Sequence, residues 1–137
     1  FKRNTLTVSY AITSASEHRL TATFAPEVNL AFLSQDPRSL RLFVSHGKAQ
    51  PREIGPELQE HAAAGEIRFD DLVNETTLTV KLGQESPLWI VPVETVSRSC
   101  DRMETGYQST GIVPLIPIDL DPGATFTTSI SLRFDKA

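Results

Sequence analysis

An alternation of apolar and polar residues with a period of two runs through most of this chain and constrains its fold more than any other feature. In the first such segment, apolar side chains at positions 6, 8, 10 and 12 alternate with small or polar ones. Successive side chains of a β-strand point to opposite faces, so this pattern predicts a half-buried strand. The same rhythm recurs at 20–24, 40–44, 67–69, 78–82 and 126–134. The chain is therefore expected to consist of many strands.

Residues that end strands separate these segments. Proline lacks the amide that a sheet requires, and glycine permits positive φ, so both indicate turns. They occur at Pro26, Pro37, Pro51, Gly55-Pro56, Gly65, Ser86-Pro87, Gly106 and Asp121-Pro122-Gly123. Asn74 is likewise expected in a turn rather than as a glycan acceptor. Many short strands with frequent turns predict an all-β fold, an antiparallel β-sandwich.

One segment, residues 51–64, departs from the alternation. Glu53, Glu57, Leu58, Glu60 and the alanines at 62–64 favour helix, while Gly55-Pro56 interrupts the run near its start. We expect a surface loop with one or two helical turns there.

The length of 137 residues fits a single domain over residues 1–137. The chain contains no internal repeat and no linker-like composition that would divide it. Because it begins with Phe1 rather than Met and enters a strand pattern at once, we expect it to be a piece of a longer polypeptide.

Composition argues against several classes of function. The net charge of −4 and the scattered Lys and Arg residues give no footprint for nucleic acid. No apolar run approaches the roughly 18 residues of a membrane span, so no membrane partner is expected. The single Cys100 allows no disulfide within the chain, which fits a cytoplasmic protein. We read Cys100 as a small side chain in a turn rather than a reactive thiol.

Motifs for metals, cofactors and catalysis are missing from the sequence. His18, His46 and His61 lie in separate predicted loops or strand ends without metal-ligand spacing, so no metal site is expected. There is no nucleophile elbow, phosphate-binding loop or dinucleotide fingerprint, so we expect no cofactor.

The stretch from Trp89 to Gln108 changes from an apolar strand into a dense polar cluster. It resembles the signature of the β-rich C-terminal domain of family-57 glycoside hydrolases, in their alpha-amylase and 4-alpha-glucanotransferase group. That signature reads roughly Pro-x-Glu-Thr-Val-Ser-x-Ser, a turn, an aromatic residue, Glu and Tyr-Gln. The matching residues are Pro92, Glu94, Thr95, Val96, Ser97, Ser99, Glu104, Tyr107 and Gln108, whereas Cys100 replaces an expected acid and Met103 an expected Phe.

The resemblance extends beyond this signature. Residues 24–33 resemble the family's Phe-x-x-Glu-x-Asn-Leu strand, and residues 118–123 resemble its turn before the last strand. The resemblance implies a β-sandwich of the galactose-mutarotase-like supersandwich type, packed beside a catalytic (β/α)-barrel domain of the same polypeptide that acts on α-glucan. A full supersandwich is longer than this chain, so we expect a truncated one. The family's catalytic carboxylates belong to the barrel, so no residue here is expected to be catalytic.

Several polar and aromatic residues remain as candidates for carbohydrate binding or for a domain interface. Glu27, Glu94 and Glu104 could grip a sugar or could be fixed structurally by hydrogen bonds. Trp89 and Tyr107 could stack on a sugar ring, although Trp89 among Leu88, Ile90 and Val91 is better explained as a core residue, and Tyr107 as a surface residue. The full set is Glu27, Asn29, Trp89, Glu94, Thr95, Ser97, Glu104, Tyr107 and Gln108.

Among these candidates, one group is expected to form a single hydrogen-bonded cluster. It comprises Glu94, Thr95, Ser97, Tyr107 and Gln108, and it requires a bulge or bend to bring Glu94 to the others.

The sequence thus favours a non-catalytic accessory domain of an α-glucan-processing enzyme. An independent carbohydrate-binding module is a second hypothesis, although the low aromatic content of 7% argues against it. An unrelated enzyme or interaction-type β-sandwich is the third, and it would make the signature match fortuitous.

Overall fold

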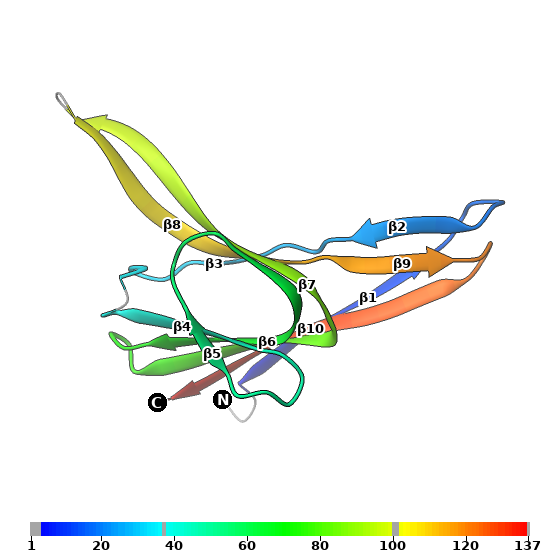
Figure 1. Ribbon diagram of the computed structural model, residues 1–137, viewed down its shortest axis with the longest axis horizontal. Helices are drawn as coiled ribbons and strands as arrows, with labels where there is room; N and C mark the ends of the chain where they lie inside the picture. Colours follow the sequence, from blue (N-terminus) through cyan, green and yellow to red (C-terminus); the bar gives the residue numbers. More distant parts are fainter. Residues whose placement is uncertain (1–3, 37, 100–101, 137) are drawn as a thin grey trace.

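A computed structural model describes residues 4–36, 38–99 and 102–136, and these ranges contain ten β-strands and no helix (Figure 1). The strands are β1 (Thr5–Thr13), β2 (Leu20–Phe24), β3 (Val28–Leu30), β4 (Leu40–Ser45), β5 (Arg52–Ile54), β6 (Gln59–Asp71), β7 (Thr76–Ser99), β8 (Arg102–Pro114), β9 (Ile116–Leu120) and β10 (Thr125–Lys136). Cys100 lies outside the described residues, so its predicted place in a turn remains a prediction.

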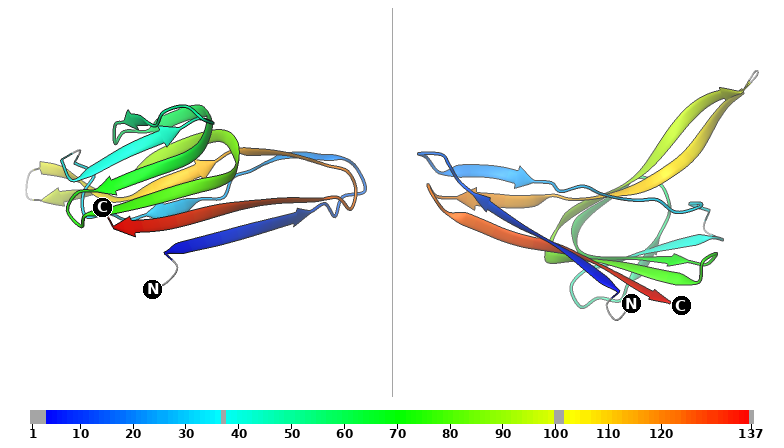
Figure 2. Two further views of the ribbon diagram at one scale, coloured as in Figure 1. Left: turned by 90° about the horizontal axis from the view of Figure 1, so that it is seen from below. Right: turned by 180° about the vertical axis from the view of Figure 1, so that it is seen from behind.

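Two layers of antiparallel strands build the molecule (Figures 1 and 2). The layer that is lower in Figure 1 has the order β1-β10-β7-β6-β4-β5, and the upper layer contains β8 between β3 and the second half of β7. β2 and β9 form a separate pair that continues the upper layer. The 24-residue β7 passes from the lower layer, where it pairs with β10, to the upper layer, where it pairs with β8. The all-β sandwich expected from the sequence is confirmed.

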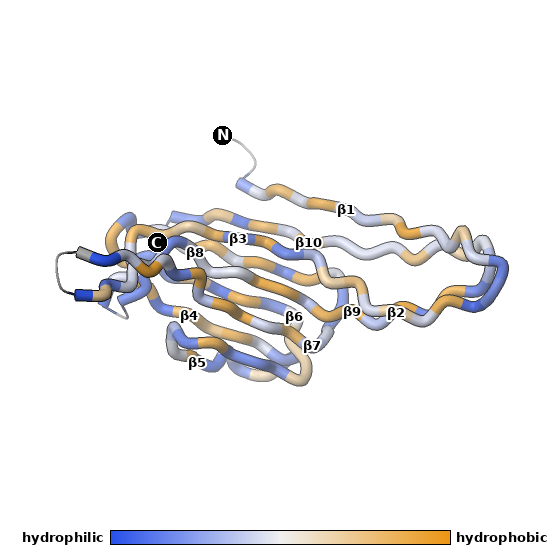
Figure 3. The backbone as a smooth tube through the Cα atoms, turned by 90° about the horizontal axis from the view of Figure 1, so that it is seen from above, coloured by the Kyte–Doolittle hydropathy of each residue, from blue (hydrophilic) through white to orange (hydrophobic). Residues whose placement is uncertain are grey.

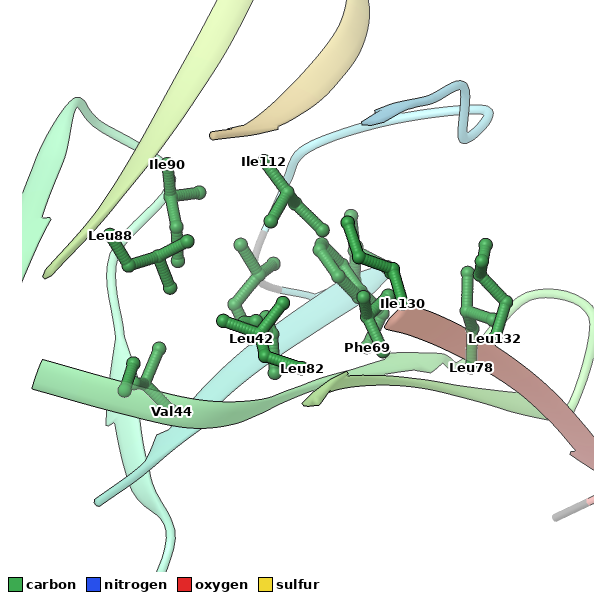
Figure 4. Close-up of a cluster of buried hydrophobic side chains, with 14 residues drawn as sticks. Leu42, Val44, Phe69, Leu78, Leu82, Leu88, Ile90, Ile112, Ile130 and Leu132 are labelled. Atoms are coloured by element: carbon green, nitrogen blue, oxygen red, sulfur yellow. The ribbon is translucent and has the colours of Figure 1, made fainter. Parts of the chain in front are cut away.

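The main hydrophobic core lies between the layers (Figure 4). Phe69 of β6 is fully buried, and its ring stacks on that of Phe32 with 5.0 Å between centroids. Alternate residues of the lower-layer strands meet inward-facing residues of β7 and β8; the buried members are Leu40, Leu42, Val44, Ala64, Ile67, Phe69, Leu78, Val80, Leu82, Leu88, Ile90, Ile112, Ile130 and Leu132. A smaller cluster around Ile116, Ile118 and Leu120 packs β9 against Phe24 and Phe126.

The predicted helical turns in residues 51–64 are wrong. This segment contains β5, a turn at Gly55-Pro56 and the first residues of β6. Gln59–His61 pair with Leu88–Ile90 of β7, and the register shifts that follow leave Ala64 fully buried opposite Ser86. The available backbone partners therefore override the local preference of Glu and Ala for helix. The described residues contain no helix long and apolar enough to cross a membrane.

The alternation predicted a half-buried first strand, but β1 is largely exposed. Leu6 and Val8 are 59% and 38% exposed, whereas Tyr10 and Ile12 further along are partly buried. Seen from above, β1 is the outermost strand of the lower layer, and no described strand of the upper layer runs over its first half (Figure 3). The alternation correctly predicted which side chains of β1 lie on the core side of the lower layer, but the upper layer does not extend over Leu6 and Val8.

Asp71 closes the turn between β6 and β7. Its Oδ1 accepts hydrogen bonds from the backbone amides of Val73 and Asn74, both at 3.0 Å, and its Oδ2 accepts one from Asn74 Nδ2 at 2.7 Å. Glu75 completes the reversal with a φ of 51°. Burial alone would raise the pKa of Asp71, but the hydrogen bonds from Asn74 and Val73 lower it. The turn role predicted for Asn74 is thereby confirmed.

Replacing Asp71 with Ala removes the acceptor of these bonds and is expected to lower the free energy of unfolding by about 1–3 kcal/mol at neutral pH. The pKa of Asp71 is lower in the folded state than in the unfolded state. Asp71 therefore contributes to the free energy of unfolding above about pH 4, and this contribution is lost as the pH falls through the folded-state pKa. Urea unfolding across this pH range measures the difference between wild type and Asp71→Ala. Asp121→Ala, an exposed turn residue, is the control. A difference that does not shrink in acid contradicts the role of the carboxylate.

Candidate functional site

The signature stretch forms a long hairpin of β7 and β8 that projects from the body of the sandwich (Figure 1). Pairing runs from Leu88 opposite Pro114 to Ser99 opposite Arg102. One register shift occurs between Val93 and Glu94, where β8 has an additional residue, Gln108. Beyond Ile90 and Thr110 neither strand has a third partner among the described residues. The predicted strand is present, whereas the irregularity lies in β8 and not in the Trp89–Ser99 strand, where a bulge or bend was expected to bring Glu94 to the cluster.

Strand alternation decides which side chains of β7 face solvent. Leu88 and Ile90 are 0% and 2% exposed and point into the core, so Trp89 between them points outward and is 42% exposed. The interpretation of Trp89 as a core residue is therefore wrong. Val93, on the same side of the strand, is 39% exposed. Sequence reasoning missed this because residues 88–91 are uniformly apolar, which conceals the alternation.

A patch of mainly apolar residues, with Asn29 at its border, covers the solvent side of the upper layer. We call it the β7–β8 outer face, and it consists of Asn29, Trp89, Val91, Val93, Gly111 and Val113. Trp89 lies opposite Val113, and Val91 lies opposite Gly111, which in turn lies opposite Asn29 of β3. Val91, Gly111 and Val113 were not among the residues predicted from the sequence, because they become neighbours of Trp89 and Asn29 only through the pairing of β7, β8 and β3.

Asn29 and Glu27 form one border of this face. Asn29 Nδ2 donates a hydrogen bond to Glu27 Oε1 at 2.7 Å. A Cβ placed on Gly111 would lie 3.2 Å from Asn29 Oδ1, so the absence of a side chain at 111 lets the amide lie close against β8. An exposed apolar patch with a polar border is typical of a surface that contacts another molecule or domain.

The outer side of the hairpin becomes polar toward its tip. Gln108 Nε2 donates to Thr95 Oγ1 at 3.2 Å, and Thr95 Oγ1 donates to the carbonyl of Gly106 at 3.3 Å. Ser97 follows on the same side, opposite Glu104. These four side chains extend the β7–β8 outer face with hydroxyl, amide and carboxylate groups.

Glu94 and Tyr107 lie on the opposite, inner side of the hairpin. Glu94 Oε1 accepts a hydrogen bond from Gln35 Nε2 at 2.9 Å. The Tyr107 hydroxyl shares a hydrogen bond of 2.8 Å with Thr110 Oγ1 and donates to the carbonyl of Leu30 at 3.4 Å. Burial raises the pKa of Tyr107, although its hydrogen bond to Thr110 acts in the other direction. Both residues attach the chain around β3 to the hairpin.

The predicted single cluster is therefore wrong, and Tyr107, the expected surface residue, is half-buried on the inner side of the hairpin. Glu94 and Thr95 are adjacent in an extended strand, so their side chains point to opposite sides. Because Gln108 is an additional residue in β8, Tyr107 lies opposite Glu94. The side chain of Gln108 is hydrogen-bonded to Thr95 on the outer side. Except for Glu94 and Tyr107, all the candidate residues lie on the outer side.

Two histidines come closer in space than the sequence suggested. The rings of His46 and His61 have centroids 5.7 Å apart. Burial, followed by the nearby His46 and Arg52, lowers the pKa of His61 and favours its neutral form. In the part of the chain that the structure describes, no third His, Cys, Asp or Glu completes a metal site with them.

Comparison with known proteins identifies the family. Residues 1–130 match the family described as Alpha-amylase/4-alpha-glucanotransferase, C-terminal. The chain belongs to this family. It is 28% identical over 123 residues to Alpha-amylase 1 of Dictyoglomus thermophilum, a match that covers 90% of this chain and 17% of that protein. The sequence-based resemblance is confirmed.

Solved structures of related fold agree with this assignment. The 4-alpha-glucanotransferase of Thermococcus litoralis superposes with a TM-score of 0.62 at 18% identity, over 96% of this chain and 16% of that one. A candidate aldose 1-epimerase of Escherichia coli K12 gives a TM-score of 0.62 at 14% identity, over 98% of this chain and 57% of that one. The galactose-mutarotase-like fold is thus confirmed, and the chain spans a small part of the length of the amylase and the glucanotransferase.

Replacing Tyr107 with Phe removes the hydroxyl that Thr110 and Leu30 share, and Thr110 is itself only 5% exposed. We expect the free energy of unfolding to fall by about 0.5–1.5 kcal/mol. Gln108→Ala is the matched control on the exposed side and should change it by less than about 0.5 kcal/mol. Urea unfolding monitored by circular dichroism provides the comparison. Equal effects of the two substitutions would show that Tyr107 does not anchor β3.

Proposed function

We propose that this chain is a non-catalytic accessory domain of an α-glucan-processing enzyme, either a 4-alpha-glucanotransferase or an alpha-amylase, and that it supports the catalytic barrel of the same polypeptide. Family membership supports this proposal, as does the small share of the relatives' length that the chain covers. The candidate acids support it as well, because Glu27 is bonded to Asn29 and Glu94 to Gln35, which is the pattern of structural carboxylates. The single Cys100, which allows no disulfide within the chain, is consistent with a cytoplasmic location of the proposed enzyme.

The exposure of Trp89 is the observation on which the proposed docking rests. A tryptophan that is 42% exposed beside the valines at 91, 93 and 113 leaves apolar area in water that a partner surface can cover. Each Å² of apolar surface removed from water contributes about 25 cal/mol. Tryptophan is also enriched among the residues that dominate the binding energy of interfaces. We therefore assign the β7–β8 outer face to contact with the barrel.

The hairpin tip adds a second reason for a partner. A two-stranded hairpin without further strands is only marginally stable in water. Val96 and Met103 near the tip are 62% and 71% exposed, so the tip buries little apolar surface of its own. Contact with the barrel would stabilise it. The polar groups of Thr95, Ser97, Glu104 and Gln108 are then available to the partner or to the hydroxyl groups of a bound α-glucan.

An independent carbohydrate-binding module is the second candidate function, and the exposed ring of Trp89 favours it. Aromatic rings stack on the apolar faces of sugars. However, Trp89 is the one aromatic residue on the β7–β8 outer face as defined above, and Tyr107 points to the other side. We therefore place sugar contact second to domain support.

Trp89 is the single tryptophan of the chain, so its fluorescence reports directly on this face. We expect a red-shifted emission that acrylamide quenches readily in the isolated chain. Adding the catalytic part of the polypeptide in trans should shift the emission to the blue and reduce quenching, because the ring becomes buried. Maltoheptaose alone should leave the emission unchanged. A response to the sugar but not to the catalytic part would favour the carbohydrate-binding module.

The chain alone should neither hydrolyse nor transfer glucosyl units, because the resemblance to family-57 glycoside hydrolases assigns the catalytic carboxylates to the barrel domain. Incubation of the purified chain with maltooligosaccharides, followed by chromatography of the products, tests this expectation. Redistribution of chain lengths that Glu94→Gln abolishes would contradict it. The full-length enzyme serves as the positive control.

A further inference from the structure

His46 and His61 meet between the two layers of the sandwich. His61 belongs to the first residues of β6, which pair with the second half of β7 in the upper layer, and it lies opposite the fully buried Leu88. His46 directly follows β4 of the lower layer, two residues after the buried Val44. Strand alternation therefore directs both rings inward, and their centroids are 5.7 Å apart. The pair is thus a contact between the layers.

The surroundings of His61 favour its neutral form. Its Nε2 atom is buried and has no hydrogen-bond partner in the part of the chain that the structure describes. A neutral imidazole can keep its proton on Nδ1, whereas a protonated one also carries a proton on Nε2. That second proton would be a buried donor without an acceptor, which is costly. A proton on His61 therefore destabilises the contact.

The charged and titratable groups that face His61 oppose its protonation. Burial has the largest effect in lowering the pKa of His61, and the charges of His46 and of Arg52 in β5 add to it. On the side of β7, His61 lies opposite the apolar Leu88. No carboxylate in the described ranges forms an ion pair with either imidazole. A proton on His61 would thus meet positive neighbours without a compensating negative charge.

The segment between the two histidines has few other attachments. β5 is the edge strand of the lower layer and pairs only with β4, over residues 52–54. Residues 56–58, which follow it, line a hollow together with Pro92 and Glu94 at the base of the hairpin. Segments with few backbone pairs open locally at a low cost in free energy. The contact between the histidines joins the two ends of this segment.

We propose that His46 and His61 form an acid-sensitive clamp that holds residues 46–61 between the two layers. The clamp is closed while both rings are neutral, and it opens when His61 takes up a proton. Opening releases residues 56–58 from the base of the hairpin. This proposal concerns the inner side of the sandwich and is independent of the docking assigned to the β7–β8 outer face.

The pH range of the clamp follows from the environment of His61. The pKa of His61 is lower in the folded state than its ordinary value of 6.5. Its contribution to the stability of the segment is therefore complete above about pH 6.5 and decreases as the pH falls from there toward the folded-state pKa.

Hydrogen exchange of the full-length polypeptide, read by mass spectrometry, tests the clamp. It is measured at about pH 8 and about pH 5, between which histidine changes its charge, and rates are corrected for the intrinsic effect of pH. We expect amides in residues 42–61 to lose protection several-fold in acid while those of β10 keep it. In His61→Gln, which cannot titrate, this loss should disappear. His18→Gln removes an exposed histidine elsewhere and should retain the loss.

Arg52→Gln provides a second test if His61→Gln does not fold. Removing the positive charge beside His61 makes its protonation easier in the folded state, so the loss of protection in acid should become smaller. An undiminished loss in Arg52→Gln would overturn the proposal. The proposal is also overturned if wild type and His61→Gln lose equal protection, or if the wild type loses none. A loss shared equally by β10 contradicts it, because acid would then act on the whole domain.

Discussion

The whole structure depends on β7 remaining a single strand while it passes from one layer to the other. Its inward side chains Leu78, Val80 and Leu82 fill the core from below, and Leu88 and Ile90 fill it from above. The same strand supplies the backbone pairs that hold β10, β6 and β8. Burial of both halves against each other therefore fixes the two layers face to face. Loss of inward packing in either half would separate them.

The passage between layers requires close backbone approaches. A Cβ at Gly83 would lie 2.9 Å from the backbone nitrogen of Ser129, so only glycine fits where β7 departs from β10. Ser86, 2% exposed, then lies opposite Ala64, where β6 changes register to follow the bend. From Leu88 onward, even-numbered side chains of β7 such as Leu88 and Ile90 point into the core, and odd-numbered ones point away from it. Trp89 therefore points toward solvent, and the exposure of the outer face is a consequence of burying Leu88 and Ile90 in the core.

The sequence predicted the strands well because period-two alternation is a local property. β1, β2, β4 and β10 appear where alternation placed them. It failed in residues 51–64, where strand pairing outweighs the local preference for helix: Glu53 pairs with β4, and Glu60 and Ala64 pair with β7. The candidate site was predicted in composition but not in arrangement. Residues 88–91 are all apolar, so the sequence does not show that Trp89 faces solvent. The position of Gln108 as an additional residue in β8 depends on the register between β7 and β8. This additional residue places Tyr107 and Thr95 on opposite sides of the hairpin.

The β7–β8 outer face has a border of hydrogen-bonding groups from Asn29 to Gln108, which suits a mixed interface between folded domains. In the proposed function, the domain supports a separately folded catalytic barrel, which its outer face contacts.

The central claim is that the β7–β8 outer face docks on the catalytic barrel, and one comparison in the full-length enzyme tests it most directly. Trp89→Asp is compared with Thr127→Asp, which places the same charge on an exposed residue of β10 in the lower layer. The half-life at a fixed elevated temperature is measured together with kcat/KM on a short maltooligosaccharide. We expect Trp89→Asp alone to shorten the half-life several-fold, with kcat/KM of the surviving enzyme unchanged in both variants. Equal half-lives for the two variants would contradict it.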